Sequence, residues 1–267
     1  MFQTSIHIIS RKAQPSQLIK TFALTILLFS CTFSYAQKLE GTIRYLKTEN
    51  VEKKMMVMDY LSKPAIDGYT YSYAQVYGNG NESTSYSILS FNATRTRYED
   101  SDENEAWFYS GRKTEFIITR DFGKHNLHDI IEFLGKNYII EDSLQAPNWK
   151  ILNEMKEIAG HICMNASYND TIKKQKIVGW YALDIPISGG PERFFGLPGL
   201  LLEVDVNDGA MVITADKIEL KKLTTELDFP KKAKGKKISE KGYIALLKKK
   251  IAENREKEKP LFDGFRY

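Results

Sequence analysis

The feature that most constrains this fold is a hairpin signal at Asn207-Asp208-Gly209, which joins two strand-like segments. The segments are LLLEVDV (200–206) and AMVITAD (210–216). Neither shows the spacing of three and four residues that an amphipathic helix requires. Asparagine, aspartate and glycine tolerate the positive φ angles of tight hairpin turns. The sequence therefore predicts two adjacent antiparallel strands here.

Strand signals of the same kind recur over most of the chain. KLEGTIRYLK (38–47) alternates apolar residues, among them Ile43 and Tyr45, with polar ones, which is typical of a strand with one solvated face. The segment YTYSYAQVYG (69–78) alternates tyrosines with mostly small residues, and Gly78-Asn79-Gly80-Asn81 predicts a turn after it. Further strands are predicted at 53–61, 83–91, 106–111, 113–121, 136–142, 148–154, 160–168 and 175–187, and a solvated acidic loop at 99–105.

The C-terminal part differs in composition. Residues 217–259 carry 15 Lys or Arg and 7 Asp or Glu. KKAKGKK (231–237) lacks large apolar residues and predicts an exposed linker. Ser239 can then cap a helix that runs to about Lys257, with Tyr243, Leu247 and Ile251 at helical spacing. The aromatic residues of 260–267 are expected to pack back on the body.

Together these patterns predict a mainly β fold. We expect a single curved antiparallel sheet, or a partly open barrel, followed by a C-terminal helix. The predicted organisation is a leader at 1–36, a β-rich domain at 37–230, and a basic linker, helix and tail at 231–267.

The N-terminus predicts export. Arg11, Lys12 and Lys20 precede the apolar run TFALTILLFS, and Ser34-Tyr35-Ala36 resembles a signal-peptidase site, so cleavage is expected before Gln37. The run is too short for a stable transmembrane span. Lipidation at Cys31 is disfavoured because the bulky Phe29 lies in the segment that a lipoprotein peptidase would read. The expected location is the periplasm or the outer-membrane or extracellular side of the envelope.

Loss of the leader also changes the charge and the cysteine count. It removes three of the 38 basic residues and none of the 34 acidic ones, so the mature chain is nearly neutral and no nucleic-acid partner is expected. Cys31 leaves with the leader. Cys163 is then the only cysteine, so an internal disulfide is excluded and apolar packing must hold the fold together.

Leu197-Pro198-Gly199-Leu200 has the composition of a type II turn. Proline fixes φ at the first central position and glycine accepts the positive φ of the second, while Gly196 frees the chain just before the turn. The flanking leucines predict a turn packed into the apolar core. Because a β-branched residue resists positive φ, Gly199→Val is expected to destabilise the protein.

This bend lies within GWYALDIPISGGPERFFGLPGLLLEVD (179–205), which resembles the signature of the GLPGLI family, exported bacterial proteins named for that string. The matching signature residues are Gly190, Pro191, Gly196, Leu197, Pro198, Gly199 and Leu200. Leu201 replaces the final isoleucine. The segment 148–168 is similar to the family's preceding tryptophan strand, but His161 stands where an aromatic residue is expected.

The resemblance implies an exported β-rich protein of a family without an established activity, often encoded near outer-membrane receptors. It brings no catalytic, cofactor or metal residues to this chain. We therefore expect the signature residues to be structural.

One set of residues has the chemistry of a metal site. If 121–135 were a single helix, Asp121, His125, His128 and Glu132 would share one face. Gly123 interrupts that helix, and HDIIEFLGKNYIIED (128–142) fits a strand, a turn and a strand equally well. Ordinary surface polar residues are the preferred interpretation, and neither a metal nor a cofactor is expected.

A second set has the chemistry of a nucleophile. His161 and Cys163 lie two apart in a predicted strand and so share a face, which could form a thiolate–imidazole pair or a copper-type pair. A nucleophile also needs an orienting partner and an oxyanion hole. A buried thiol packed in the core is the simpler interpretation, because free cysteine is commonly buried.

Other signals are weaker. G-x-S-x-G, H-E-x-x-H, P-loop and G-x-G-x-x-G motifs are absent. Trp107, Trp149 and Trp180 could line a pocket for a sugar or lipid, but their strand context favours core packing. The tripeptides starting at Asp142 and Asp170 resemble a bacterial O-glycosylation sequence, and the basic tail could contact phosphate-bearing surfaces.

The sequence thus favours a non-enzymatic binding or accessory protein of the cell envelope, with an outer-membrane receptor or another envelope protein as partner. The first alternative is a carrier that holds a hydrophobic or peptide ligand in the concave face of the sheet. The second is a hydrolase built on Cys163 and His161.

Overall fold

The computed structural model describes residues 39–77, 81–103 and 116–261. Its strands are β1 Gly41–Asn50, β2 Glu82–Phe91, β3 Arg95–Asp100, β4 Ile117–Asp121, β5 Asn126–Phe133, β6 Lys136–Ser143, β7 Lys150–Ile158, β8 His161–Asp170, β9 Gln175–Ala182, β10 Leu200–Val206, β11 Met211–Leu220 and β12 Lys236–Ile238. Its helices are α2 Val51–Met56, α3 Lys63–Tyr77 and α4 Glu240–Glu256. The predicted leader, the strand at 106–111, residues 78–80 of the first turn and the tail beyond Leu261 lie outside the described residues.

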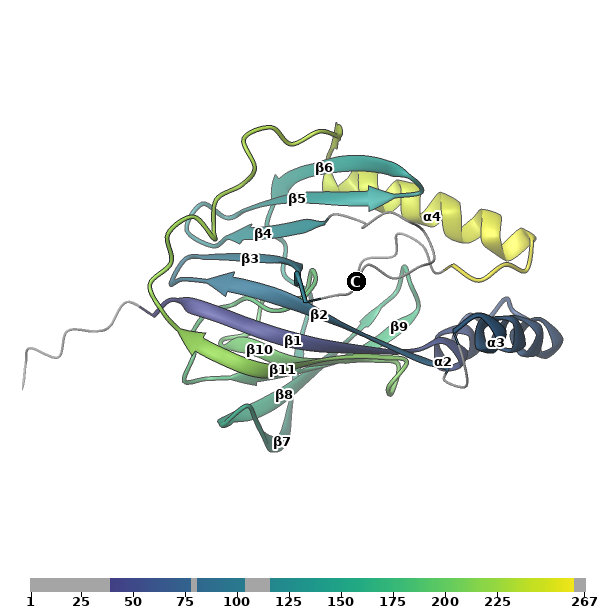
Figure 1. Cartoon of the computed structure of the whole chain (residues 1–267), viewed down its shortest axis with the longest axis horizontal. Helices are drawn as coiled ribbons and strands as arrows, with labels where there is room; N and C mark the ends of the chain where they lie inside the picture. The colour runs from purple at the N-terminus through teal and green to yellow at the C-terminus, as the bar shows by residue number, and fades with distance from the viewer. Residues whose placement is uncertain (1–38, 78–80, 104–115, 262–267) are drawn as a thin grey trace, which may run out of the picture. The chain divides into compact units, whose positions relative to one another are not determined.

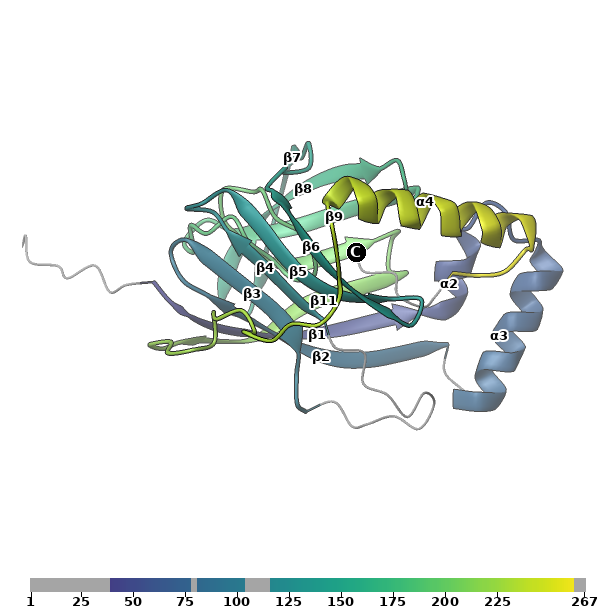
Figure 2. The same cartoon turned by 90° about the horizontal axis from the view of Figure 1, so that it is seen from above.

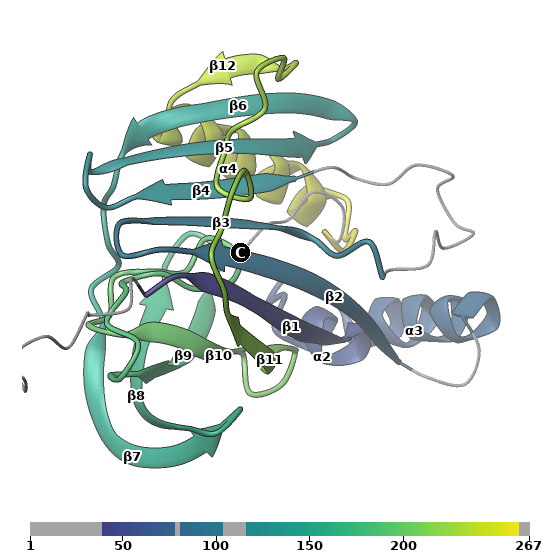
Figure 3. The ribbon, with the colours of Figure 1, turned by 60° about the vertical axis from the view of Figure 1, so that its left-hand side comes forward.

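All the strands belong to one 12-stranded sheet, in the order β12-β6-β5-β4-β3-β2-β1-β11-β10-β9-β8-β7 (Figure 1). Neighbouring strands are antiparallel except β12 and β6, which are parallel. Figure 3 shows the sheet curling from β12 at one end to β7 at the other. The prediction of a mainly β fold with one curved sheet and a C-terminal helix is confirmed.

Tight turns with positive φ join the hairpins. Gly135 has φ 73° between β5 and β6, Gly160 has φ 84° between β7 and β8, and Gly209 has φ 89° between β10 and β11. Asn207 and Asp208 also have positive φ. Such turns match the twist of the strands they connect, which confirms the hairpin predicted from Asn-Asp-Gly.

The main apolar core lies on one face of the sheet, here called the inner face. The strand register aligns one residue from each of six neighbouring strands in a row: Ile43, Leu89, Tyr98, Ile118, Asp129 and Ile140. All six side chains are buried. Asp129 is the one charged member of an otherwise apolar or aromatic row, and its partners are described with the site below.

Helix α4 packs on the inner face over β5 and β6 (Figure 2). Ser239 caps it, because the Ser239 hydroxyl accepts a hydrogen bond from Gly242 N, as the sequence predicted. Tyr243 and Leu247 are buried among Ile131 and Phe133 of β5 and neighbouring residues. The helical spacing of apolar residues therefore correctly predicted which face of α4 packs.

The segment between β11 and β12 crosses the opposite, outer face of the sheet, which Figure 3 shows. Arg97 of β3 donates to Asp228 O at 2.6 Å, and the Phe229 ring stacks on His128 of β5. The predicted linker (231–237) is only partly irregular, because Lys236 and Lys237 pair with β6 in strand β12. The acidic loop also starts later than predicted, since Glu99 and Asp100 end β3.

Two predicted strands are helices. Residues 53–61 fall mostly in α2 and the bend after it, and 69–77 fall in α3. Asn50 caps α2 by accepting from Lys53 N at 2.9 Å. In α3, Ile66 and Tyr73 pack toward α2, while Tyr71 is exposed. The alternation of tyrosines was therefore misleading, and Pro64 in the first turn was the overlooked helix signal.

Among the described residues, the helices are too short or too polar to cross a membrane.

The proline-glycine bend is built differently from the prediction. Gly199 is not among the residues with positive φ, whereas Gly196 has φ 105°. The type II turn is therefore wrong. Gly199 is required for another reason: a Cβ added there would lie 2.1 Å from Ala182 O, so two backbone segments touch at this point. Leu197 and Leu200 are buried as expected, but Pro198 is exposed.

Gly199→Val is expected to destabilise the protein by about 3 kcal/mol, because the new side chain must push apart backbone rather than a flexible side chain. For a domain of this size that loss lowers the thermal midpoint by roughly 6–12 °C. Gly68→Val in α3 is the matched control, since a Cβ at Gly68 meets nothing within 4 Å. An unchanged midpoint for Gly199→Val in a thermal scan would contradict the close approach.

Candidate functional site

The segment between β9 and β10, residues 183–199, fills the inner face and is here called the plug. Ile185, Ile187, Phe194 and Leu197 belong to the main core cluster. The plug is held by its own backbone, with Leu200 N donating to Ile185 O at 2.9 Å and Gly196 N to Ser188 O at 3.0 Å. The signature residues lie in or directly after the plug.

Two glycines explain why the plug packs so closely. A Cβ at Gly190 would lie 2.7 Å from the Leu201 side chain, and one at Gly196 would lie 2.6 Å from Ala146 Cβ. These distances are too short for any side chain. Gly190 and Gly196 therefore lie where no side chain has room, and the concave face is occupied by the chain itself.

The plug presents the charged side chain of Arg193 to the buried Asp129 of the sheet. Arg193 Nε donates to Asp129 Oδ2 at 3.2 Å, and Arg193 Nη2 donates to the Glu240 carboxylate at the start of α4. Asp129 is fully buried and also accepts from Arg120 Nη1 of β4 at 2.5 Å. Asp129 thus joins two arginines from separate elements, which compensates the cost of burying its charge.

A cavity of about 430 Å³ opens beside these arginines and is here called the arginine pocket. Strand register places Arg120, Leu127 and Asp142 in one row of β4, β5 and β6 at its wall. Its other wall residues include Tyr168, Lys173, Arg193, Phe195, Lys241 and Ile244. The pocket therefore lies where the sheet, the plug, the β8–β9 turn and the start of α4 meet.

Burial perturbs the cations of the arginine pocket. It lowers the pKa of the Arg120 guanidinium, which the nearby Asp129 carboxylate offsets only in part. Burial likewise lowers the pKa of the Lys173 ammonium, which Asp170 pairs at 3.4 Å. Arg120 also lies 5.4 Å from the centre of the Phe195 ring, a cation–π contact. Burial thus disfavours the charged forms of both Arg120 and Lys173.

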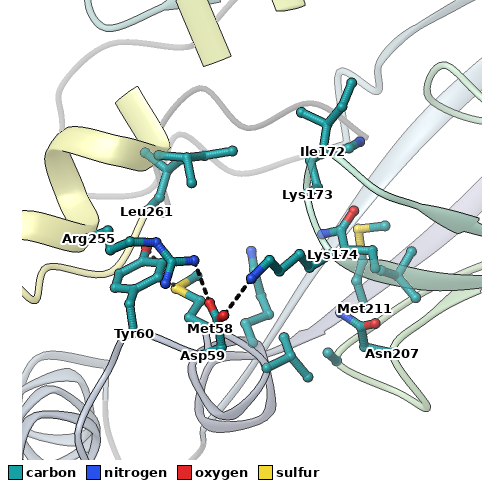
Figure 4. Close-up of a pocket in the computed structure, with 16 residues that line it drawn as sticks. Met58, Asp59, Tyr60, Ile172, Lys173, Lys174, Asn207, Met211, Arg255 and Leu261 are labelled. Carbon is teal, nitrogen blue, oxygen red and sulfur yellow. Dashed lines mark hydrogen bonds and ion pairs between the residues drawn. The ribbon is translucent and has the colours of Figure 1, made fainter. Parts of the chain in front are cut away.

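A second cavity lies between α2, α4 and the turns β8–β9 and β10–β11, and is called the α2–α4 pocket (Figure 4). Its volume is about 70 Å³, and Met58, Met211, Ile251 and Leu261 are among its apolar wall residues. That is roughly half the volume of an engineered cavity that binds benzene. The α2–α4 pocket therefore has room for a small apolar group and not for a whole ligand.

An ionic bridge crosses the α2–α4 pocket. Asp59 accepts from Lys174 Nζ at 2.5 Å and from Arg255 Nη2 at 2.6 Å, as Figure 4 shows. The hydrogen bonds from Lys174 and Arg255 lower the pKa of the Asp59 carboxyl. Asp59 thus ties the end of α4 to the β8–β9 turn, and Lys173 in that turn lines both pockets.

The structure does not assemble the proposed Cys163–His161 pair. Cys163 is buried in the main core and directs its thiol to His161 O at 3.6 Å. The His161 ring instead bonds Asp184 Oδ2 at 2.7 Å. Burial raises the pKa of the Cys163 thiol to about 11. These features fit a packed thiol and disfavour a thiolate nucleophile.

The proposed metal set is also dispersed. Asp121 accepts from Lys124 N in a turn, and His125 lies in that turn with φ 54°. His128 stacks on Phe229 on the outer face and pairs with Glu141 at 3.1 Å. Among the described residues, no group of three His, Cys, Asp or Glu side chains could hold a metal ion.

The tryptophans support the core more than a pocket. Trp149 donates from Nε1 to Phe195 O of the plug at 2.9 Å and packs edge-on against Tyr168. Lys156 Nζ lies over the Trp180 ring, 4.2 Å from the ring centre. Trp107 lies outside the described residues. Asp142, part of one glycosylation-like tripeptide, caps α4 by accepting from Glu240 N at 3.0 Å.

Sequence analysis missed the three residues at the centre of the site, Arg120, Asp129 and Arg193. A signal was present, because Arg120 and Asp129 interrupt apolar strand segments and Arg193 interrupts the apolar signature. Charged residues are seldom buried unless they are paired. Strand register, which brings the first two together, is not visible in a single sequence.

Comparisons with known proteins agree with this fold and leave the activity open. A family model described as "Protein of unknown function (Porph_ging)" matches residues 168–203, which include β9 and the plug. Comparison with curated proteins gave no match. Two solved structures of PNGF-II, in the P21 and C2 space groups, are similar with TM-scores of 0.51 and 0.50, each at 16% identity.

These two matches cover 78% and 81% of this chain but only 33% of the PNGF-II chain. The chain therefore spans about a third of the length of the structures it resembles. At this identity the likeness shows the fold alone. The chain shares a β architecture with part of PNGF-II and a short signature with a family of unknown function.

Proposed function

We propose that this chain is an exported, non-enzymatic binding protein of the bacterial cell envelope that holds a small ligand in the arginine pocket. The observation that carries the proposal is a cavity of about 430 Å³ walled by buried, paired charges and aromatic side chains. Ligand sites typically occupy about 300–1,000 Å³, with mostly apolar walls and a few placed polar groups. The α2–α4 pocket falls below that range.

The proposed location and partner depend on the sequence. The N-terminal leader pattern supports export, and the resemblance to the GLPGLI family supports an accessory role beside an outer-membrane receptor or another envelope protein. In this proposal the arginine pocket is the part of the chain that binds the ligand. The plug, which carries the signature, positions Arg193 and Phe195 in its wall.

The two alternatives are less well supported. A ligand deep in the concave face would have little room, because the plug packs into that face. The position available to the ligand of a carrier is the arginine pocket. A hydrolase built on Cys163 and His161 lacks the required geometry, since the His161 ring bonds Asp184 and the thiol is buried.

The proposal predicts that protein purified gently from envelopes carries a bound small molecule, detectable by native mass spectrometry. Ile244→Trp is expected to abolish this added mass, because Ile244 lines the arginine pocket and the larger indole would obstruct it. Ala245→Trp is the matched control, since Ala245 is the next residue of α4 and is exposed. Protein without added mass, or equal retention by Ile244→Trp, would contradict the proposed function.

The absence of a reactive nucleophile is tested separately. Cys163 in folded protein is expected to react slowly with iodoacetamide at pH 7.5, and faster as the pH rises toward about 11. His161→Ala should leave this rate unchanged, and urea-unfolded protein serves as the reactive reference. Fast alkylation at neutral pH that His161→Ala abolishes would restore the hydrolase alternative.

A further inference from the structure

Arg120, which lines the arginine pocket, has an unused hydrogen-bond donor. Among the described residues, Arg120 makes its side-chain hydrogen bonds through Nη1, to Asp129 Oδ1 and to Thr119 O. Arg120 Nε is buried and has no partner within the described part of the chain, although only 4% of the residue is exposed. An unsatisfied buried donor is costly, so it is most often explained by a group that the protein alone does not supply.

The carboxylates around the pocket already accept hydrogen bonds. Asp129 Oδ1 accepts from Thr119 N and Arg120, and Asp129 Oδ2 accepts from Arg193. The two Asp142 oxygens accept from the backbone N–H groups of Ser143 and Glu240. Glu240 accepts from Arg193, so these carboxylates each have a donor already, whereas Arg120 Nε has no acceptor among the described residues.

Asp170, which pairs with Lys173, is occupied as well. Its Oδ1 accepts from Ile172 N at 2.8 Å and Lys173 N at 2.9 Å, and its Oδ2 pairs with Lys173 Nζ. Burial lowers the pKa of both Lys173 and Arg120, so a nearby negative charge would stabilise their charged forms. Lys241 adds a further cation at the exposed rim.

Part of the wall is apolar. Leu127, Phe194 and Ile244 face the same cavity as the guanidinium groups, and Tyr168 adds an aromatic ring. A ligand that fits this wall has an acceptor-only charged end and an apolar body. A carboxylate matches a guanidinium best, because both groups are planar and can pair through two hydrogen bonds.

We infer that the arginine pocket binds the carboxylate of a small organic acid, with Arg120 as its donor and the acid's apolar body against Phe194 and Ile244. This inference rests on the proposed function and adds to it the chemical class of the ligand. Arg120 and Lys173 recognise the charge, while the apolar wall sets the size and shape of the body.

The test is calorimetric titration of the full mature chain. The probes are 3-phenylpropionate and octanoate, the primary amide of each acid, and octyl phosphate as a second comparison for octanoate. We expect at least one acid to bind about tenfold or more tightly than its amide. Arg120→Lys keeps a positive charge beside Asp129 but removes the Nε donor. It should reduce the acid-to-amide affinity ratio about tenfold.

Further variants keep the test decisive if Arg120→Lys does not fold. Lys241 is exposed, and Lys241→Gln should weaken binding of the acid about threefold without affecting binding of the amide. Ile244→Trp should abolish binding of both, and Ala245→Trp should change neither. Circular dichroism and thermal scans confirm the fold of each variant.

The outcomes separate the two proposals. Equal affinity for acid and amide, with both lost in Ile244→Trp, overturns the carboxylate inference and leaves the binding function intact. Tighter binding of octyl phosphate than of octanoate overturns it in favour of a phosphate-bearing ligand. If wild-type protein binds none of the probes, the carboxylate inference is also overturned. The proposed function is tested separately, by whether native mass spectrometry detects a co-purified molecule.

Discussion

The packing of the plug against the inner face is the constraint on which the rest of the structure depends. A sheet of 12 strands that curls on itself must fill its concave side, either with ligand or with protein. Here residues of the chain do so, with backbone in direct contact between Gly199 and Ala182. Glycine is the only residue that permits such an approach. The apolar signature therefore closes the core, and any ligand is directed to the edge of the plug.

The buried carboxylate of Asp129 then fixes how the plug, the sheet and α4 are oriented. Arg193 bonds Asp129 from the plug and Glu240 from α4, while Arg120 bonds Asp129 from the neighbouring strand. Removing one member of such a group leaves an uncompensated buried charge and is strongly destabilising. An apolar row through β5 would be simpler to stabilise. The charges at this position thus set one geometry for the wall of the arginine pocket.

Much of the fold could be predicted from local sequence, and little of the site. Alternation and Asn-Asp-Gly correctly placed β1, β10, β11 and their turn, and Ser239 correctly started α4. The tyrosines of α3 alternate like a strand, yet the helix packs through Ile66 and Tyr73, seven residues apart. Short-range alternation cannot distinguish these cases when few side chains are buried. The site depends on register: Arg120, Leu127 and Asp142 become neighbours only after β4, β5 and β6 pair. The exact role of Gly199 was equally hidden, because it depends on a contact with Ala182 across the plug.

The likeness to PNGF-II concerns the arrangement of strands, whereas the proposed role of the arginine pocket depends on individual side chains. A shared β architecture at 16% identity follows from strands that curl and pack in similar ways. The arginine pocket instead depends on specific residues of the plug, the β8–β9 turn and the start of α4. The shared sheet therefore does not indicate what this chain binds; in the proposal above, binding depends on the residues at the inner edge of the sheet.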